Sequence, residues 1–526
     1  MAEIALTMSG GGYRAAMFHL GTISYLNHLK LSDGRCMLDE VNILSTISGG
    51  TITGLWYMMN LCRGKDIDES IRELYNLLVS SQIVSYALNS MMQSDNKNSS
   101  AIKEFIKVYD RVFFHDETFR LIQDGVDHTH VHHFSANGTD FSTGIGFRFQ
   151  ATEELESDNP AFKRGFIGNK PHQVPWGVAS DFKLSEILAV SSCFPGGFEP
   201  LLYPNDFSIY GMEEYKDYIE TQKEHEFILM DGGIVDNQGI EPVLLAETQM
   251  GQGKEPCSEK NIDLIIVSDV ASPRVNAVEF GLPFRMNNMT WKGLNLTLDL
   301  LIVVLVAILW VVKTNAFCAG AVSVFLFISV ILRTLTTVAK HKIAKWFSKL
   351  PFSGEWGNLV HLPFNKMQDM AETRISSLLT LAQGVFMKPI RQMRYNQLYK
   401  DEGWYNRLIS NNVHELSSKG SYRWKEGYPE YLKPTEATKE NSDKAANMGT
   451  TLWFSEKEKA DGVPEALFTA GQYTICMNLL EYLEKITQDR RNTSEVHSNW
   501  LNCIDQLKSD WESFQNNPHC MLSKVL

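Results

Sequence analysis

Three consecutive glycines, Gly10, Gly11 and Gly12, directly follow a short apolar run near the start of the chain. Consecutive glycines are costly to order, so they indicate a place where backbone without side chains is needed. At a strand end that opens onto a helix, they leave free N–H groups that bind an anion. Acyl transfer needs such donors for the oxyanion of its tetrahedral intermediate. We therefore predict an oxyanion hole at these glycines, with Arg14 bracing the loop or adding positive potential.

A phosphate-binding loop is the alternative interpretation of the same glycines. The stretch SGGGYR, residues 9–14, lacks the Gly-Lys-Ser/Thr sequence of a P-loop and the spacing of a dinucleotide-binding fingerprint. The acyl-transfer interpretation then requires a nucleophile and a base elsewhere in the chain.

A candidate nucleophile, Ser48, lies in the stretch STISGG at residues 45–50. An apolar run precedes this stretch and an apolar helical pattern follows it, which predicts a nucleophile elbow, a tight strand-to-helix turn that exposes a serine hydroxyl. Thr46 occupies the position where the usual elbow has its first glycine, and we expect the turn to open just after Ser48 instead. A serine that only caps the following helix is the simpler alternative.

A candidate base, Asp231, lies in the stretch LMDGGIVDNQGIEP at residues 229–242, at the end of an apolar run and before two glycines. A carboxylate is a weak base at neutral pH, so burial would have to raise its pKa. Asp236 and Asp269 are rivals: Asp236 lies further into the loop, where a turn contact is expected, and Asp269 ends a strand without the following glycines. No histidine has a comparable context.

Taken together, these motifs resemble the patatin-like phospholipase family. Its G-G-G-x-R loop is matched by Gly10–Arg14, its serine elbow by Thr46–Gly50, and its D-G-[GA] motif by Asp231–Gly233, with Asn237 following. Two further stretches, FSANGTDFSTG at 134–144 and AVSSCFPGGFEP at 189–200, are similar to family segments. The motifs occur in the family's order over roughly residues 3–275.

The resemblance implies an α/β fold of three layers around a mostly parallel sheet, and a Ser48–Asp231 dyad in place of a triad. It implies that Ser48 attacks an ester of a phospholipid or another acyl lipid, that Asp231 takes its proton, and that water releases the acyl group afterwards. It implies no cofactor.

The surrounding sequence predicts the elements that position these residues. Residues 3–8 and 41–47 are typical of buried strands, and helical patterns follow at 13–29 and from residue 51. This strand–turn–helix order favours a layered α/β sheet. Residues 66–127 are predicted to be a helical insertion, interrupted by the polar stretch 93–100. Strands return within 130–149, 226–231 and 261–270, and we expect the last two to be central parallel strands.

Composition narrows the function. A formal net charge of −13 over 526 residues argues against a nucleic-acid binder. The eight cysteines are scattered without a C-x-x-C pair, so we expect neither a disulfide framework nor a zinc site, and the first residues do not have the pattern of a signal peptide. In the stretch DHTHVHHF, residues 127–134, His128, His130 and His132 would share one face of a strand. No supporting carboxylate pattern accompanies them, and no metal site is predicted.

Two apolar segments, Leu294–Val312 and Ala316–Leu332, are separated only by the link KTN. Each is close to the roughly 20 apolar residues that span a bilayer. Basic residues flank the pair on both outer ends, which predicts a transmembrane or re-entrant hairpin with its ends on the cytoplasmic side. A very apolar helical hairpin buried in protein is the alternative.

The sequence thus predicts three parts: a catalytic domain at residues 1–280, the hairpin at 290–335, and a mainly helical C-terminal region at 345–526. The predicted function is a lipid acyl hydrolase of the phospholipase A type, held at the membrane bilayer. Hydrolysis of neutral acylglycerols or other carboxylic esters, and an inactive membrane scaffold with the same fold, are the alternatives. The sequence identifies no protein partner.

Overall fold

The computed structural model describes residues 3–93, 100–153, 167–209, 226–251, 262–271, 280–347, 362–381, 385–401, 403–404, 406–420, 428–488 and 499–525. It contains two compact units. Unit 1 combines Met1–Arg274 with Phe386–Leu526, and unit 2 is Val275–Val385. Most of the polar interruption predicted at 93–100, as well as Cys257 and Lys349, lies outside the described residues.

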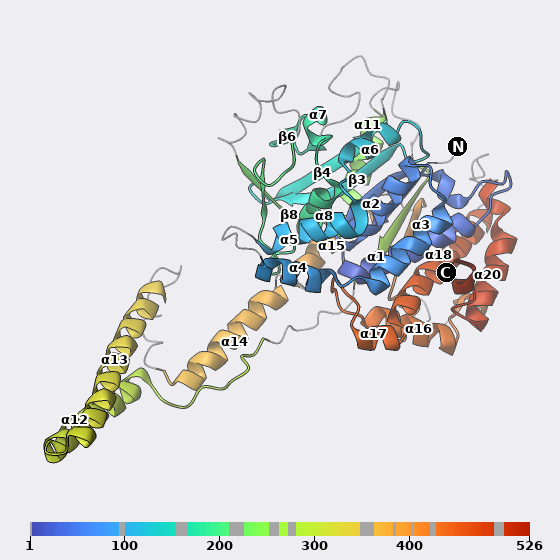
Figure 1. Ribbon diagram of the computed structural model, residues 1–526. Helices are drawn as coiled ribbons and strands as arrows, with labels where there is room; N and C mark the ends of the chain where they lie inside the picture. The colour runs from blue at the N-terminus through green and yellow to red at the C-terminus, as the bar shows by residue number, and fades with distance from the viewer. Residues whose placement is uncertain are drawn as a thin grey trace. The chain divides into compact units, whose positions relative to one another are not determined.

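A ten-stranded, mostly parallel sheet forms the centre of unit 1 (Figure 1), as predicted. Its main path runs β10-β9-β1-β2-β3-β4-β5-β6. The first five of these strands are mutually parallel, and each of β4, β5 and β6 runs antiparallel to the strand before it in this path. The strands are β1 (Ile4–Met8), β2 (Val41–Ile47), β3 (His133–Asp140), β4 (Ile145–Thr152), β5 (Ile167–Gly168), β6 (Gln173–Val174), β7 (Leu201–Tyr203), β8 (Phe227–Asp231), β9 (Leu264–Asp269) and β10 (Leu408–Asn412).

Helices cover both faces of this sheet, because its central strands carry apolar side chains on both sides. In β1, Ile4, Leu6 and Met8 belong to the large core, and Ala5 belongs to a second, smaller core, as the two-residue period of a strand requires. Residues of α1, α2, α8 and α18 fill the large core, and residues of α11 and α15 fill the small one. Three layers result.

The helices of unit 1 follow the predicted pattern in its N-terminal part. They are α1 (Gly12–His28), α2 (Gly49–Cys62), α3 (Ile67–Ser80), α4 (Ile83–Gln93), α5 (Ala101–Tyr109), α6 (Phe119–Gly125), α7 (Trp176–Ala179), α8 (Leu184–Ser192), α10 (Gly233–Asp236), α11 (Ile240–Gly251), α15 (Met387–Tyr399), α16 (Glu436–Asn447), α17 (Glu456–Ala460), α18 (Val463–Gln488), α20 (Ile504–Asn516) and α21 (Leu522–Val525). Shorter helical turns are η1 (Met37–Glu40), the π-helical η2 (Asp110–Phe114) and η7 (Glu430–Leu432).

Two sequence predictions in this region are wrong. Strand β8 is not a central parallel strand: it runs antiparallel to both β3 and β7. An apolar run is compatible with either direction, because strand direction is set by distant pairing partners. The second error concerns the histidines of residues 128–132, which precede β3 and therefore do not share a strand face. His130 pairs with the Tyr57 hydroxyl, and His132 forms an ion pair with Glu153.

The C-terminal residues 386–526 contribute directly to the layers of unit 1. Strand β10 extends the sheet beside β9 in a parallel register. Helix α18 packs along α1, and their backbones nearly touch, because a Cβ on Gly21 would overlap the Phe468 carbonyl and a Cβ on Gly471 would overlap the Phe18 carbonyl. Both glycines are required by this close approach.

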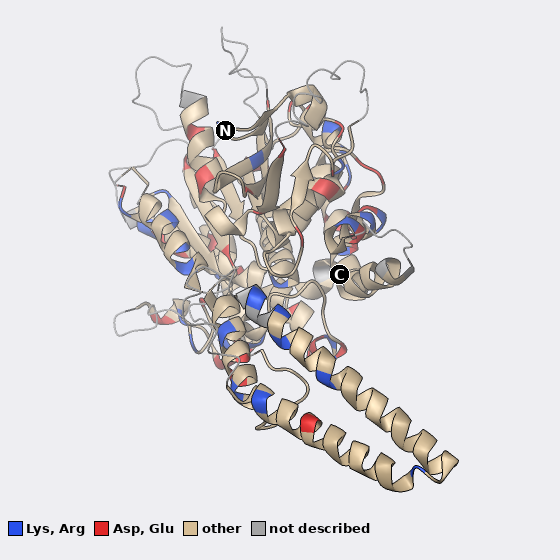
Figure 2. Cartoon of the chain, turned by 90° about the vertical axis from the view of Figure 1, so that its left-hand side faces the viewer, with Lys and Arg blue, Asp and Glu red and all other residues tan. Residues whose placement is uncertain are grey.

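Unit 2 contains a helical hairpin, α12 (Trp291–Val312) and α13 (Ala316–Phe347), and the helix α14 (Phe364–Thr380). The link between α12 and α13 is residues 313–315, where the sequence predicted it. Helices α12 and α13 lie side by side (Figure 2). Both are long and apolar enough to span a membrane, with mean hydropathies of 2.6 and 2.2 over their candidate segments.

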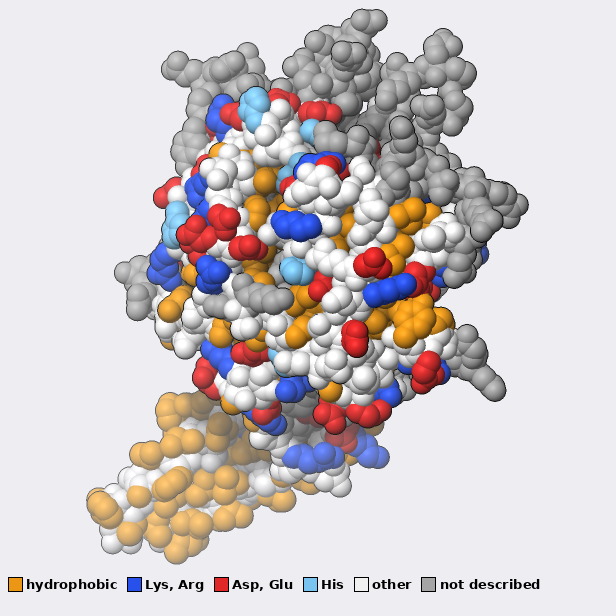
Figure 3. Space-filling model, turned by 90° about the vertical axis from the view of Figure 1, so that its right-hand side faces the viewer, with side chains coloured by type: hydrophobic (Ala, Val, Ile, Leu, Met, Phe, Trp, Pro, Cys, Tyr) orange, Lys and Arg blue, Asp and Glu red, His pale blue; other side chains and the backbone are white. Residues whose placement is uncertain are grey.

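Helix α12 has no fully buried residue, and its only half-buried apolar side chains form a stripe that includes Leu298, Ile302 and Leu305 along α13. Large apolar side chains such as Trp310, Phe317 and Phe327 are 72%, 85% and 67% exposed. Hydrophobic colour dominates the surface of the hairpin in Figure 3. This composition identifies α12 and α13 as candidate membrane spans.

Candidate active site

Strand β3 brings the two ends of the candidate dyad together. Strand β2 runs parallel to the first half of β3 and ends with Ile47 opposite Asn137. Strand β8 runs antiparallel to the second half of β3 and ends with Asp231 opposite Gly138. Because β4 occupies the other edge of β3 along its whole length, the C-terminal ends of β2 and β8 meet head to head at neighbouring residues. Ser48 and Asp231 therefore lie at neighbouring positions, and hydrogen bonding to the Ser48 side chain is one of the influences that lower the pKa of Asp231.

Ser48 occupies a strained turn between β2 and α2. Its backbone has φ 49° and ψ −116°, a conformation that residues other than glycine rarely adopt. Strain of this kind occurs at functional sites, where the surrounding structure enforces it. Ser191 supports the turn: its hydroxyl accepts the Ser48 N–H at 2.8 Å and donates to the Asn137 carbonyl at 2.8 Å. The geometry is that of a nucleophile elbow.

The residues around Ser48 fit this turn. Thr46 lies within β2 and donates its hydroxyl to the Ser135 carbonyl at 3.2 Å, so the residue that departs from the usual motif has no strained backbone. Gly49 and Gly50 are required by contact, because a Cβ on Gly49 would overlap the Gly12 carbonyl and a Cβ on Gly50 would overlap the Met8 carbonyl. The elbow thus packs directly against the end of β1 and the glycine loop.

Asp231 has the properties of a base that works near neutral pH. Its side chain is buried, and burial raises its pKa from 3.8 to about 7. Two hydrogen bonds oppose this rise, one from the Gly233 N–H at 2.6 Å and one from Ser48. A carboxylate with a pKa near the working pH combines sufficient basicity with a substantial ionised fraction.

The glycine loop offers two amides to a ligand rather than three. The Gly10 N–H donates to the Asn237 carbonyl at 3.0 Å, and the Tyr13 N–H donates to the Thr451 carbonyl at 2.8 Å. Between them, the N–H groups of Gly11 and Gly12 have no protein acceptor among the described residues. Both glycines have positive φ, 149° and 60°. An oxyanion would therefore bind to Gly11 and Gly12 at the N-terminus of α1, and Gly10 would hold the loop.

Arg14 is a brace in this structure. Its side chain is 8% exposed, and its guanidinium donates to the Met448 carbonyl at 2.8 Å. Burial and the nearby Arg391 lower its pKa to about 10, so Arg14 stays protonated at neutral pH. The contact ties the first turn of α1 to the segment after α16. A Cβ on Gly12 would overlap the Thr451 carbonyl, so the same segment also contacts the loop itself.

The rival carboxylates have other partners. Asp236 caps a turn, accepting the N–H groups of Gln238, Gly239 and Glu241. Asp269 accepts the Ala271 N–H and forms an ion pair with Arg391. Neither has a recorded contact with Ser48 among the described residues.

The sequence did not assign roles to four residues that hold the site. Ser191 and Asn137 lie in the two additional family-like stretches, and Asn237 follows the Asp231 motif, so each had a weak signal. Thr451 had none, because it acts through its backbone carbonyl. His19 also supports the loop from behind: it is fully buried, bonds to the Ser9 carbonyl and the Ser268 hydroxyl, and burial lowers its pKa to about 4.

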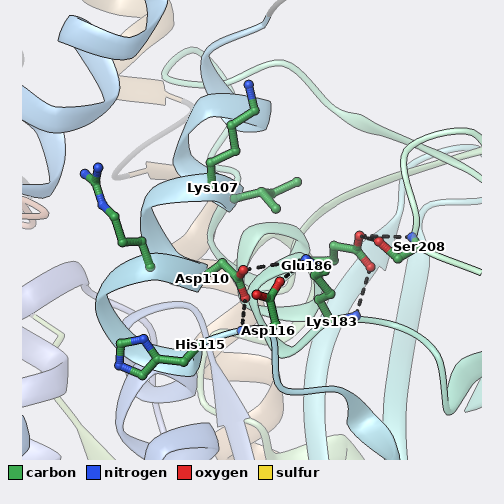
Figure 4. Close-up of a pocket in the computed structure, with 9 residues that line it drawn as sticks. Lys107, Asp110, His115, Asp116, Lys183, Glu186 and Ser208 are labelled. Carbon is green, nitrogen blue, oxygen red and sulfur yellow. Dashed lines mark hydrogen bonds and ion pairs between the residues drawn. The ribbon is translucent and has the colours of Figure 1, made fainter.

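Figure 4 shows a hollow in unit 1 that is lined by residues such as Asp110, Asp116 and Lys183. It measures about 510 Å³ and includes neither Ser48, Asp231 nor the glycine loop among its lining residues. Charged side chains in this hollow have partners within it. Lys183 pairs with Asp116 at 2.6 Å, and Glu186 accepts hydrogen bonds from the N–H and hydroxyl of Ser208. We therefore assign the chemistry by the dyad geometry and not by the size of the hollow.

Comparisons with known proteins identify a family for part of the chain. Residues 6–244 match the family model described as patatin-like phospholipase. No curated protein sequence matches the chain. Among solved structures, human GIVD cytosolic phospholipase A2 is 16% identical with a TM-score of 0.25, covering 36% of this chain and 28% of that chain. Its complex with methyl gamma-linolenyl fluorophosphonate is 15% identical with a TM-score of 0.28, covering 50% and 40%. The matched part therefore spans less than half of those human chains.

Proposed function

We propose that this chain, of which residues 6–244 form a patatin-like phospholipase domain, is a membrane-anchored serine hydrolase that cleaves acyl esters of phospholipids. The family match supports a lipid hydrolase. The phospholipase A type of cleavage, the dyad and the anchoring are our proposals. The observation that carries them is the position of Ser48, in its strained elbow, next to the buried Asp231, whose pKa is raised to about 7.

In the proposed reaction, the Ser48 oxygen attacks the ester carbonyl carbon while its proton passes to Asp231. The carbonyl oxygen becomes an oxyanion and accepts the N–H groups of Gly11 and Gly12. Collapse of the tetrahedral intermediate breaks the bond to the leaving oxygen, which takes the proton from Asp231, and the acyl group stays on Ser48. A water molecule then attacks this ester and gives a proton to Asp231. The bond to the Ser48 oxygen breaks, this oxygen takes the proton back from Asp231, and a fatty acid is released.

The hairpin supports a location at the membrane. Its apolar side chains are exposed in unit 2, and basic residues precede α12 and follow Arg333 in α13. From the positive-inside rule, we infer that both outer ends face the cytoplasm, and we propose the same side for the catalytic unit. Anchoring raises the local concentration of substrate, so that modest affinity for an individual lipid is sufficient.

Incubation with mixed-lipid vesicles tests the proposal. The wild-type chain should release fatty acid and lysophospholipid, and Ser48→Ala should release neither. A fluorophosphonate probe should label the wild type and leave folded Ser48→Ala unlabelled.

Release of fatty acid only from neutral acylglycerols, or from another ester, would replace the substrate class and retain the dyad. Absence of both labelling and product from correctly folded protein would favour the inactive scaffold.

A further inference from the structure

We infer that the α12–α13 hairpin crosses the whole hydrocarbon layer of a bilayer, so that the link at residues 313–315 reaches the opposite interface. Two polar contacts between the helices, Asp299–Arg333 and Asn295–Thr336, then lie in the leaflet where α12 begins, which we call the near leaflet. The inference rests on the membrane anchoring proposed above and deepens it, since that proposal holds equally for a hairpin that dips into one leaflet.

The lengths of the helices match one bilayer. Helix α12 has 22 residues and is therefore about 33 Å long at about 1.5 Å per residue. On α13, Lys340 lies about 36 Å from Ala316 by the same measure. The hydrocarbon core of a bilayer is about 30 Å thick. With Lys313 at the far interface, Trp291 at the start of α12 and Lys340 on α13 both reach the near interface, which suits an amphipathic ring and an ammonium group.

Between Lys292 and Lys340, apart from Lys313 in the link, the charged side chains are Asp299 and Arg333, and they pair with each other. The Arg333 Nε lies 2.7 Å from one Asp299 oxygen and its Nη2 lies 3.4 Å from the other, a two-point contact. About one helical turn closer to the start of α12, the Thr336 hydroxyl donates to Asn295 Oδ1 at 2.9 Å. Paired in this way, the charges are tolerated in hydrocarbon and fix the register of the two helices.

The remaining hydroxyls of the segment are satisfied inside their own helices. Each donates to a carbonyl four residues earlier: Thr297 to Gly293, Ser323 to Ala319, Ser329 to Phe325, Thr334 to Val330 and Thr337 to Arg333. Water would satisfy these groups if the hairpin were solvated, whereas a lipid environment offers no partner. Exposed helical hydroxyls of unit 1, such as those of Ser80 and Ser513, form the same bond, so the pattern is compatible with lipid but does not identify it.

A hairpin confined to one leaflet conflicts with the position of Lys313. Asp299 lies about 21 Å from Lys313 along α12, which exceeds the thickness of one leaflet, about half of the 30 Å core. With the ion pair at the near interface, the Lys313 ammonium would be left beyond the bilayer midplane without a carboxylate partner among the described residues. In the spanning arrangement it reaches the far headgroups, next to the Trp310 ring, whose centroid lies 5.0 Å from Lys313 Nζ.

A protein partner fits the surface less well than lipid does. A helix that docks into a groove carries one apolar stripe and a polar opposite face. Helix α12 is half-buried only along the stripe that packs on α13, which includes Leu298, Ile302 and Leu305, and it exposes apolar side chains over the rest of its circumference. Lipid is the occupant that covers so wide an apolar surface.

Thiol labelling of the full chain in sealed vesicles tests the inference. In a Cys318→Ala background, which removes the exposed thiol next to the link, Thr314→Cys reports on the link. Phe284→Cys, 56% exposed and ahead of α12, reports on the near side. A membrane-impermeant maleimide is added outside or trapped inside, and the Cys318→Ala parent gives the background from the remaining cysteines.

We expect the two positions to react from opposite sides of the membrane. Reaction of both from the same side, or failure of Thr314→Cys to react from either side until detergent is added, would overturn the spanning arrangement. Release of the chain from the vesicles by carbonate washing would instead reject the anchoring itself, so the two failures are distinguishable.

The polar contacts are tested by retention in carbonate-washed membranes. Asp299→Asn or Arg333→Gln alone leaves an unpaired charge in the near leaflet, so each should lower the retained fraction severalfold. The double variant removes both charges and should recover most of the loss. Equal retention of the single variants and the wild type would place the pair outside the hydrocarbon and contradict the inference.

Discussion

Units 1 and 2 treat apolar side chains in opposite ways. In unit 1, strand β9 is a run of apolar residues that is fully buried between two layers of helices. In unit 2, helix α12 is equally apolar and has no buried residue. The comparison teaches that apolar composition identifies the need for a nonaqueous environment but not its source. Unit 1 supplies that environment from its own chain, and unit 2 requires it from outside.

The two units also treat a carboxylate differently. In unit 2, Asp299 is neutralised by Arg333. In unit 1, Asp231 is buried with only hydrogen bonds to stabilise its charge, and its pKa is raised to about 7. Pairing gives a static contact, whereas an unpaired buried carboxylate can gain and lose a proton at neutral pH.

The largest expected effect is the loss of catalysis in Asp231→Asn. The amide cannot accept the proton of Ser48, so hydrolysis of a soluble ester should fall by at least about 10²-fold, the lower range for removal of a general base. Carbonate-resistant association with membranes should not change. The rate is measured in detergent on folded protein, and retention of most of the activity would show that Asp231 is not the base.

Deletion of Leu294–Leu332 is the matching change in unit 2. The shortened chain should move to the soluble fraction, and its activity on vesicles should fall by about tenfold or more, because the effective concentration from anchoring is lost. Activity on a soluble ester should stay within about twofold of the wild type, since the dyad is unaltered. Firm membrane association of the deleted form would contradict the anchoring role of the hairpin.

The pH dependence of hydrolysis should report the pKa of Asp231. Only the ionised carboxylate accepts the Ser48 proton, so with a pKa of about 7 the rate at pH 6 should be about one tenth of the rate at pH 8. A rate that is constant between pH 6 and pH 8 would show that burial does not raise this pKa in the working enzyme. The hairpin deletion should keep the same profile.

The free energy of unfolding of unit 1 should also depend on the protonation of Asp231, and it should fall as the pH rises. The folded pKa of Asp231 is raised above its unfolded value of 3.8, so the folded state holds the extra proton between pH 4 and 7. Its free energy of unfolding therefore declines as the pH rises through this range and is level above it. Asp231→Asn removes this penalty, and its gain in melting temperature should be larger at pH 8 than at pH 4. An equal gain at both pH values would contradict the raised pKa.

The smallest expected effect comes from the brace between the glycine loop and the C-terminal segment. Arg14→Met removes a buried charged hydrogen bond to Met448 and should lower the free energy of unfolding by about 1.5–3 kcal/mol. Arg63→Met is the matched control, because Arg63 pairs with Glu117 at the surface. A surface ion pair contributes about 1 kcal/mol or less to the free energy of unfolding. Denaturant unfolding of both variants is the measurement, and equal losses would show that the brace is unimportant.

The sequence by itself determined the local features of this protein. The serine elbow, the glycine loop, the two helices of the hairpin and their link follow from neighbouring residues, because turn geometry, helix length and hydropathy are local properties. The family also followed from these motifs, and residues 6–244 match it.

Only the tertiary structure decided how these features meet. The antiparallel direction of β8 brings Asp231 to Ser48 along β3, and a parallel β8 would put it at the other end of the strand. Contacts with Asn237 and Thr451 leave Gly11 and Gly12, and not Gly10, as the free donors. These outcomes depend on strand pairing and on backbone carbonyls that are far away in the chain. Every residue type has the same backbone carbonyl, so a residue pattern does not indicate which carbonyl accepts a given N–H group.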